Sequence, residues 1–451
     1  MKIETLKTFK KPMPKDEYQL LAKEVLEDLS LLKAKEIYGD VLDVQIADRL
    51  RQETEELSRC CDLGMIAEVV EAMNTEKEKG HLYLSRLSQS NSLLFYLLGI
   101  GSVNPLPPRH TYCPKCHALY WENRKAPLCE CCKEPLKEDG YDLPFEVLLE
   151  EIKRNGLTFD FSSANFHKDA ALPIRYFEDP LIQLATELGF TQEEIEKNDV
   201  SWEDTETVMK CLFSPDTESE LSFYAKEYKK MSICNHRPYI GIPDLGTALM
   251  EKTFNDDFEC YESFDDFVKV VAMIQGTGVV EANEYYVCDC FINSYIGDAI
   301  ATRDELYHFL MNSQLSKEDA LLVYRETCSH GETSLSKLSE SKLKEAGVDE
   351  KYIDFMNRVT YLFYKGPSVA HTRLAVKVAK IYLEEPLRYY KAYFTLHKES
   401  LYKMDIDYDF IKGLSESNPP DREEIYLAAV DFMERGYDPK QLIEEVLSNE
   451  S

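Results

Sequence analysis

Four cysteines have the spacing of a metal-binding site. Cys113 and Cys116 are separated by two residues, as are Cys129 and Cys132, and twelve residues lie between the pairs. Each pair can form a tight turn that presents two thiolates to one side of a tetrahedral Zn²⁺. The segment 110–142 has few apolar residues for a core, so a bound metal would supply its folding energy. We therefore predict a structural zinc site with no open coordination position.

Other cysteines lack such a pattern. Cys131 could compete with its neighbour Cys132 as a ligand, but a turn with one intervening residue after Cys129 has poorer geometry, so Cys132 is preferred. The adjacent Cys60 and Cys61 are expected to be packing residues, because free cysteine is among the most often buried residue types. The nine histidines show no metal-binding spacing, so no second metal site is predicted.

Charge and composition limit the classes of partner. The chain has 451 residues, with 52 Lys and Arg against 82 Asp and Glu, which gives a net charge of −30. Proteins that grip a phosphate backbone usually present a basic face, so any DNA contact here would be local. No apolar run reaches 18 residues and no signal peptide is visible. We expect a cytoplasmic protein with reduced thiols and no membrane contact.

The elements that must position these residues are mostly helices. Amphipathic patterns predict helices over 17–32, 44–59 and 63–73. A Ser or Thr followed three residues later by an acid predicts further helix starts, at Thr191/Glu194, Ser201/Asp204, Ser263/Asp266 and Ser316/Asp319. Pro439 suits the first turn of the last helix. We predict a mainly α fold with a small β component (α+β).

Several stretches of the chain form long, distinctive motifs. They include AKEIYGD (34–40), VNPLPPRHTYCPKC (103–116), KEDGYDLPFEVLL (137–149), YIGIPDLGT (239–247) and the segment 349–395. These stretches resemble the catalytic core of the PolC-type DNA polymerase III α subunit of low-GC Gram-positive bacteria, and the last of them resembles its fingers region. The resemblance covers roughly residues 31–440. It implies an N-terminal helical arm over 1–45, a partial palm-like region over 46–103, a zinc module over 104–142, a palm remnant over 143–177 and a fingers-like helical domain over 178–451.

The chain departs from this family at the catalytic positions. In the family, an Asp-x-Asp pair and a third Asp on the palm hold two Mg²⁺ ions for phosphoryl transfer. Here Gly156 and Thr158 stand at the positions of the pair, and the third falls near Pro173. Only the fifteen residues 163–177 remain where the family has a long thumb-and-palm segment. Asp160 alone cannot hold two metal ions, so we predict no catalytic residue.

The nucleotide site implied by the resemblance is also altered. The family's Ser-Arg-Gly-Ser triphosphate loop corresponds to Ser85, Arg86, Leu87 and Ser88. Leu87 replaces the glycine that lets the backbone approach a phosphate closely. Lys365 matches a lysine of the family's fingers, but the Ala-His that follows it there is Gly-Pro here. These residues are interpreted as a remnant of a nucleotide- or DNA-binding site.

One helix carries a local basic strip. Arg373, Lys377 and Lys380 lie four and then three residues apart, and therefore on one helix face. A basic face in an otherwise acidic chain could contact a phosphate backbone or an acidic partner protein. A solvated helix face without a partner explains the same pattern equally well.

The function that we predict is binding without catalysis. The chain would be a non-catalytic PolC relative that binds DNA through the basic strip, or a replisome or other partner protein. One alternative is a compact polymerase in which Asp160, with Asp169, Glu178 or Asp179, forms an altered Mg²⁺ site. A second alternative, favoured by the net charge of −30, is a structural or inhibitory protein without DNA contact.

Overall fold

The chain folds into two compact units. The computed structural model describes residues 14–107, 110–121, 128–164, 172–213, 242–243, 245, 263–283, 296–329, 334–401, 425, 428–429, 431–432 and 435–448. The first unit comprises Met1–Glu178, Gln275–Ala282 and Ile300–Ala370, and the second comprises Asp179–Ile274, Asn283–Ala299 and His371–Ser451. The helical region expected over 178–451 is therefore divided between the two units. None of the described helices combines the length and the apolar composition that crossing a bilayer requires.

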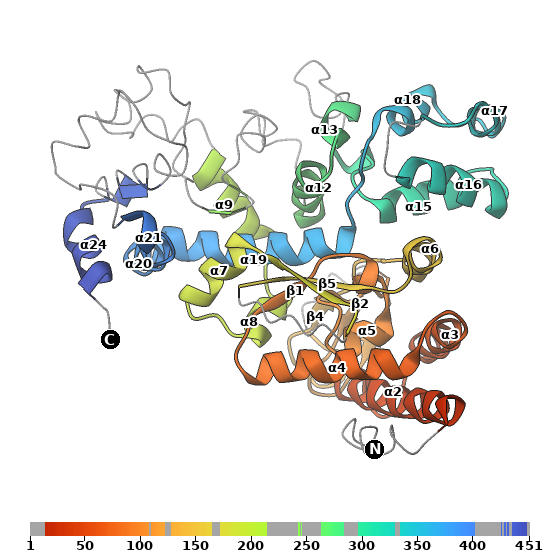
Figure 1. Ribbon diagram of the computed structural model, residues 1–451, viewed down its shortest axis with the longest axis horizontal. Coiled ribbons are helices and arrows are strands. Elements are labelled where there is room, and N and C mark those ends of the chain that lie inside the picture. The colour runs from red at the N-terminus through yellow and green to blue at the C-terminus, as the bar shows by residue number, and fades with distance from the viewer. Residues whose placement is uncertain are drawn as a thin grey trace. The chain divides into compact units, whose positions relative to one another are not determined.

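Three helices come first among the described residues of the first unit. They are α2 (Lys15–Tyr38), α3 (Val44–Cys60) and α4 (Leu63–Glu78), and they confirm the three predicted helices with longer ends. Asp43 and Asp62 cap α3 and α4, because their side chains accept backbone N–H groups that have no partner inside the helix. The three helices lie together beneath a small sheet (Figure 1).

One face of the small sheet packs on the first three described helices. Its strands are β1 (Tyr83–Ser85), β5 (Phe159–Ser163) and β6 (Ile174–Glu178), in the order β1-β5-β6. Strand β1 pairs antiparallel with β5, and β6 pairs parallel with it. Side chains alternate between the faces of a strand, and those of one face join the core formed by α2, α3 and α4, namely Tyr83, Phe159, Phe161 and Ile174.

A second sheet carries the four cysteines. Strands β2 (His110–Tyr112), β3 (Leu119–Tyr120) and β4 (Lys137–Asp139) form an antiparallel sheet in the order β3-β2-β4. The first Cys-x₂-Cys turn joins β2 to β3, and the second precedes β4. The chain then enters α6 (Phe145–Asn155), which leads directly into β5.

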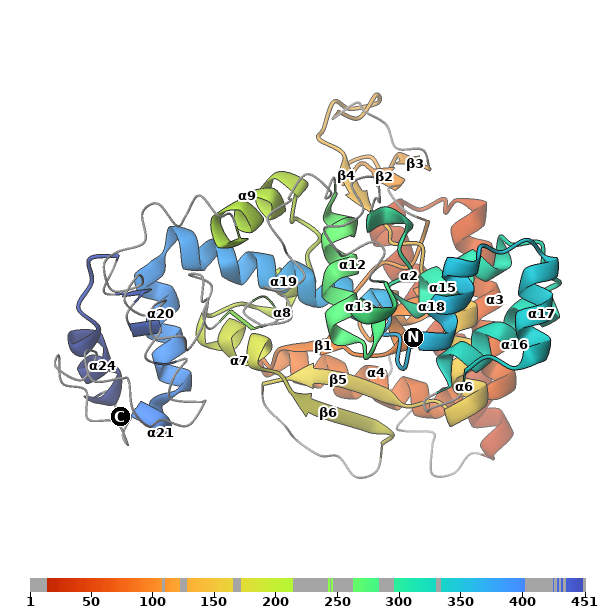
Figure 2. The same cartoon turned by 90° about the horizontal axis from the view of Figure 1, so that it is seen from above.

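Helices complete both units (Figure 2). The first unit adds η1 (Ser88–Asn91), α5 (Leu93–Leu97), α13 (Val279–Ala282), α15 (Arg303–Met311), α16 (Lys317–Cys328), α17 (Lys337–Glu345), α18 (Glu350–Arg358) and the start of α19 (Lys365–Glu384). The second unit contains α7 (Pro180–Glu187), α8 (Gln192–Glu196), α9 (Trp202–Phe213), α12 (Phe264–Gln275), η4 (Ile296–Asp298), α20 (Pro386–Leu396), α21 (Lys398–Leu401) and α24 (Pro439–Ser448).

The predicted helix starts are confirmed. Reciprocal side-chain and backbone hydrogen bonds join the two members of the capping pairs that begin with Thr191 and Ser201. The pairs that begin with Ser263 and Ser316 also cap their helices, and Pro439 opens α24. These starts follow from residues that are close in sequence, which explains why the sequence predicts them well. The fold is mainly helical with a small β component, as expected.

Candidate functional site

The four predicted zinc ligands come together in the first unit. The Sγ atoms of Cys113, Cys116, Cys129 and Cys132 all lie within 4.8 Å of one another. Cys113 Sγ lies 3.4 Å from Cys132 Sγ, and Cys116 Sγ lies 3.4 Å from Cys129 Sγ. Among the described residues, this is the one group of three or more His, Cys, Asp or Glu side chains close enough to hold a metal ion.

The two cysteine turns have the same backbone geometry. In the first, Cys113 N donates to Ala118 O at 2.9 Å and His117 N donates to Cys113 O at 2.9 Å. The second turn repeats both bonds, from Cys129 N to Glu134 O and from Lys133 N to Cys129 O. His117 and Lys133 both have positive φ, 58° and 61°, which reverses the chain directly after each cysteine pair.

The chemistry of these thiols fits a metal. Four sulfur ligands in a compact group match the composition of structural Zn²⁺ sites. Hydrogen bonds from backbone N–H groups, that of Cys132 first, lower the pKa of the Cys129 thiol to about 6. A lowered pKa, as at Cys129 and Cys113, favours the thiolate, which is the form that binds a metal, whereas the pKa of the Cys116 and Cys132 thiols is raised. The four-cysteine cluster is therefore compatible with zinc.

The remaining cysteines lie elsewhere. Cys131 is exposed and outside the four-sulfur group, so Cys132 is the residue that completes it. The expectation that Cys60 and Cys61 are packing residues is wrong for Cys60, which is exposed, while Cys61 is half-buried. Both stand where α3 ends, and a helix end leaves side chains less covered than a helix centre does.

The sheet of β1, β5 and β6 holds a neutralised carboxylate. Asp160 lies on β5 and Arg175 lies opposite it on β6. Arg175 Nε donates to Asp160 Oδ1 at 2.8 Å, and Arg175 Nη2 donates to Asp160 Oδ2 at 2.9 Å. Burial raises the pKa of the Asp160 carboxyl above its usual value, against the opposing effect of the Arg175 guanidinium. Both carboxylate oxygens are thus occupied by a protein cation in a two-pronged ion pair.

A second arginine lies on the same sheet face. The Arg86 guanidinium lies over the ring of Phe177, 4.8 Å from its centroid, and its positive charge acts on Asp160. Arg86 N also donates to Asp160 O at 2.9 Å. Two guanidinium groups therefore accompany one carboxylate on this face, which gives it an excess of positive charge.

The other acids named for an altered metal site do not join Asp160 in the described structure. Glu178 lies three residues beyond Arg175 on β6, and side chains alternate between strand faces, so it lies on the face opposite to Asp160. Asp179 belongs to the second unit, where it caps α7 and its Oδ2 lies 2.9 Å from His371 Nε2. Asp169 lies outside the described residues.

The serine loop that the sequence resemblance assigns to a triphosphate site is buried. Ser85 and Ser88 are 0% and 2% exposed. Ser85 Oγ lies 2.5 Å from Ser90 Oγ, so these hydroxyls satisfy each other. Gly366, at the start of α19, packs so closely on this loop that an added Cβ would lie 2.4 Å from the Cβ of Ser90. The loop is therefore covered by the protein's own chain.

Lys365 is held by its backbone. Its N–H donates to Asp304 Oδ2 at 2.8 Å, so a carboxylate from α15 caps the start of α19. Asp304 is fully buried, and it also accepts a hydrogen bond from Asn91 Nδ2 at 2.5 Å. The side chain of Lys365 itself is half-buried. This network joins the serine loop, α15 and α19 within the first unit.

Two lysines of the basic strip form ion pairs with acids of the second unit. Arg373 is 2% exposed. Lys377 Nζ lies 2.7 Å from Asp199 Oδ1, and Lys380 Nζ lies 2.5 Å from Asp204 Oδ1. The three residues do share a helix face, as their spacing predicts, but within the described structure this face meets acids of the same chain.

Sequence reasoning missed Arg175 and the Glu151 network. Glu151 Oε2 accepts hydrogen bonds from Tyr364 Oη at 2.7 Å and from Arg303 Nη1 at 3.1 Å, and Arg303 is 2% exposed. The sequence offered one sign of Arg175, namely a basic residue within the apolar and aromatic stretch IRYFE (174–178). Its partner follows only from the parallel register of β5 and β6, which the sequence does not state.

Curated proteins named DNA polymerase III PolC-type are similar to this chain. That of Thermotoga petrophila is 23% identical over 487 aligned residues, covering 83% of this chain and 35% of the relative. That of Bacillus subtilis is 23% identical over 504 aligned residues, covering 87% of this chain and 34% of the relative. That of Clostridium perfringens is 30% identical over 186 aligned residues, covering 41% of this chain and 12% of the relative. No protein-family profile matches the chain.

This chain is similar in sequence to PolC-type DNA polymerase III over most of its residues. It spans about a third of the length of the PolC-type relatives that it matches over most of its residues. The aligned spans of 487 and 504 positions exceed the 451 residues of the whole chain. Since the spans are longer than the chain, the PolC-type relatives contain internal segments that this chain lacks.

Proposed function

We propose that this chain is a non-catalytic relative of PolC-type DNA polymerase III that acts by binding. The observation that carries the proposal is the ion pair in which Arg175 occupies both carboxylate oxygens of Asp160. Asp160 is the acid that the resemblance leaves on the palm-like strand. A guanidinium in this position supplies permanently the positive charge that a metal ion would otherwise bring.

Electrostatics support this proposal. Two-metal phosphoryl transfer needs several carboxylates to hold two divalent cations about 4 Å apart. Here one carboxylate faces Arg86 and Arg175, so the local charge repels a divalent cation rather than attracting it. Glu151, whose charge also acts on Asp160, is already bound by Arg303 and Tyr364.

The buried serine loop supports the same conclusion for nucleotide binding. A triphosphate site needs exposed backbone N–H groups that can approach the phosphate oxygens. Ser85, Ser88 and Ser90 are buried, and the start of α19 packs against them at Gly366. Opening this site would require the chain to move away from a close-packed contact.

We propose Zn²⁺ as the metal of the cysteine cluster. Cys113, Cys116, Cys129 and Cys132 would hold it, and the metal would supply the cross-link that joins the two turns. With all four positions filled by sulfur, the site is structural and takes no part in chemistry on a substrate.

A partner protein is the binding target that we favour over DNA. Lys377 and Lys380 are paired with Asp199 and Asp204, so a phosphate backbone would have to displace existing ion pairs. The net charge of −30 adds long-range repulsion of nucleic acid. We propose a protein of the replication machinery as the partner, since the similar proteins are named DNA polymerase III PolC-type.

Primer extension tests the absence of catalysis. The purified chain is incubated with a primed template, all four deoxynucleoside triphosphates and Mg²⁺ or Mn²⁺, with the PolC-type polymerase of Bacillus subtilis as the positive control. We expect no extension above the blank. Template-dependent extension that disappears in Asp160→Ala, with the fold of the variant checked by circular dichroism, would instead establish the compact polymerase.

A further inference from the structure

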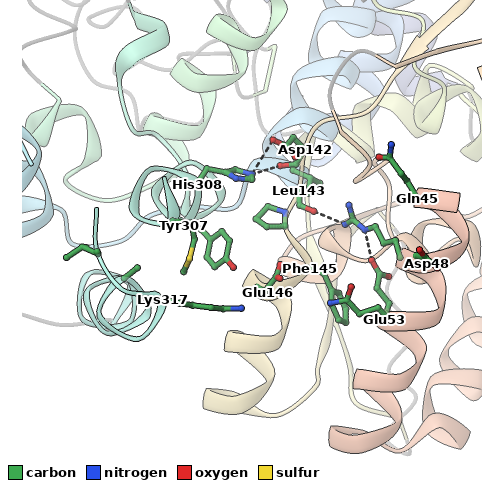
Figure 3. A pocket seen from close by; sticks show the side chains of 16 residues that line it. Gln45, Asp48, Glu53, Asp142, Leu143, Phe145, Glu146, Tyr307, His308 and Lys317 are labelled. Atoms are coloured by element: carbon green, nitrogen blue, oxygen red, sulfur yellow. Dashed lines mark hydrogen bonds and ion pairs between the residues drawn. The ribbon is translucent and has the colours of Figure 1, made fainter. Parts of the chain in front are cut away.

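A pocket of the first unit has no role in the site described above. Its volume is about 790 Å³, and it lies between the first half of α3, the start of α6, and the helices α15 and α16 (Figure 3). This volume falls within the range of pockets that bind small ligands or several side chains.

The pocket has an apolar floor. Tyr307 and Phe145 are 7% and 5% exposed, and Met311 and Leu315 line the pocket beside them. Arg49 forms part of the wall, but its guanidinium is already used, because it donates to Glu53 Oε1, Pro105 O, Asn91 O and Leu143 O at 2.8 to 3.1 Å. The floor therefore favours an apolar group.

The rim of the pocket carries an excess of negative charge. Its lining residues include the acids Asp48, Asp142 and Glu146 and the cation Lys317, while Arg49 and Glu53 neutralise each other. Asp48 forms an ion pair with Arg51, and His308 Nε2 lies 3.4 Å from Asp142 Oδ2, so the negative charge available to a ligand rests mainly on Glu146. Within the described residues, Glu146 has neither an ion pair nor a hydrogen-bonding side-chain partner. Its charge reaches the floor, since burial and then the negative charge of Glu146 raise the pKa of the Tyr307 phenol.

We propose that this pocket binds a short peptide segment of a partner protein in which a leucine-like side chain stands next to a lysine or arginine. The apolar side chain would lie against Tyr307 and Met311, and the cation would meet Glu146. The amide side chains of Gln45 and Gln52 also line the pocket and can hydrogen-bond to a peptide backbone. This inference rests on the proposed binding function and names the chemistry of its partner.

Phosphate-bearing ligands do not fit this site. The Glu146 carboxylate at the rim repels a phosphate, and the Arg49 guanidinium in the wall is held by four acceptors of its own chain. A basic peptide meets both requirements, because it offers a cation for the rim and an apolar group for the floor.

Fluorescence anisotropy with the full chain tests the proposal. The probe is a fluorescein-labelled peptide of alternating leucine and arginine, and two control peptides replace arginine by glutamate or leucine by serine. The variant Glu146→Gln removes one rim charge without changing the size of the side chain. The matched control is Glu24→Gln, which removes the same charge from an exposed position on α2 outside the pocket.

We expect the leucine–arginine peptide to bind and both control peptides to bind more weakly. Glu146→Gln should weaken binding about fivefold, as the loss of one partly exposed ion pair does, and Glu24→Gln should change it less than about twofold. Equal weakening by the two variants would show non-specific attraction to an acidic protein and would overturn the proposal, as would the absence of binding. Because primer extension does not use this pocket, either proposal can fail while the other stands.

Discussion

At the scale of single residues, the central feature is an ion pair with unequal partners. The side chain of Asp160 is 5% exposed, whereas that of Arg175 is 59% exposed. A buried charge depends on its partner much more than a solvated one does. The pair therefore stabilises the fold mainly by satisfying the carboxylate that the strand buries.

This inequality predicts a difference between two variants. Arg175→Ala leaves a buried carboxylate unpaired and should lower the free energy of unfolding by about 2 kcal/mol at pH 7. Asp160→Ala leaves an exposed guanidinium in water and should cost less than about 1 kcal/mol. Urea unfolding at equal protein concentration measures both, and a larger cost for Asp160→Ala would contradict this account of the pair.

The same variant should show a pH dependence. Burial raises the folded-state pKa of Asp160, and the Arg175 guanidinium opposes this effect. In Arg175→Ala the opposing charge is gone, so the folded-state pKa should lie further above the unfolded value than it does in the parent. A carboxyl with a raised folded-state pKa binds its proton more tightly in the folded protein, so the destabilisation should shrink as pH falls through that value. Urea midpoints of the variant and the parent, compared between pH 7 and pH 5, test this, and a constant difference would argue against it.

Glu151 should show the opposite pH dependence. Burial acts to raise its pKa, but the hydrogen bond from Tyr364 and the charges of Arg303 and Arg154 outweigh burial and hold the pKa below the usual 4.5. A carboxylate with a lowered folded-state pKa stabilises the fold above pH 4.5, and this contribution is lost as pH falls through the lower value.

Substitution of Glu151 tests this contribution. Glu151→Gln leaves the buried Arg303 without its anion and should lower the free energy of unfolding by about 3 kcal/mol at neutral pH. The cost should decrease below pH 4.5, where the parent also loses the charge. Urea unfolding at pH 7 and pH 4 measures the effect, with the exposed Glu24→Gln as the control, and equal costs for the two variants would count against a structural role of the network.

At the scale of elements, two backbone turns build one metal site. They share the same pair of hydrogen bonds and the same positive φ after the second cysteine. The first turn is also attached to the end of α2, because His117 Nδ1 lies 3.0 Å from Ile37 O. The short strands around the turns bury few apolar side chains, so the metal is expected to be their main cross-link.

Metal removal should therefore unfold the segment 110–142 locally. We expect one equivalent of zinc per chain, its release by a chelator at neutral pH, and faster proteolysis within this segment afterwards. Cys113→Ser should abolish the bound zinc, whereas Cys131→Ser, at the exposed neighbouring cysteine, should leave one equivalent. Metal analysis with limited proteolysis distinguishes the variants, and unchanged protease resistance after chelation would refute the structural role.

At the scale of the whole molecule, charge opposes DNA binding. The net charge of −30 and the ion pairs of Lys377 and Lys380 predict no measurable affinity for single- or double-stranded DNA, even at low salt where counterion release is most favourable. Electrophoretic mobility shift with labelled oligonucleotides tests this. A complex that weakens steadily with rising salt and is lost in Lys380→Ala would contradict this prediction and identify the basic strip as a DNA-binding site.

Features that depend on residues close together in the chain could be predicted from the sequence alone. The helix starts at Thr191 and Ser316 and the two cysteine turns depend on residues a few positions apart, and the sequence predicts them because local hydrogen bonds create them. The replacement of the expected aspartates by Gly156 and Thr158 is also visible in the sequence alone.

Tertiary structure decided what each of these residues meets. Arg175 reaches Asp160 only because β6 pairs with β5 in a parallel register, and a shift of one residue would place Arg175 on the other face of the sheet. Lys377 and Lys380 share a helix face by their spacing, but packing determined that acids of the same chain cover that face. Local sequence patterns predict which side chains share a face of a helix or strand. Only the packing of segments that are distant in the sequence determines which residues those side chains contact.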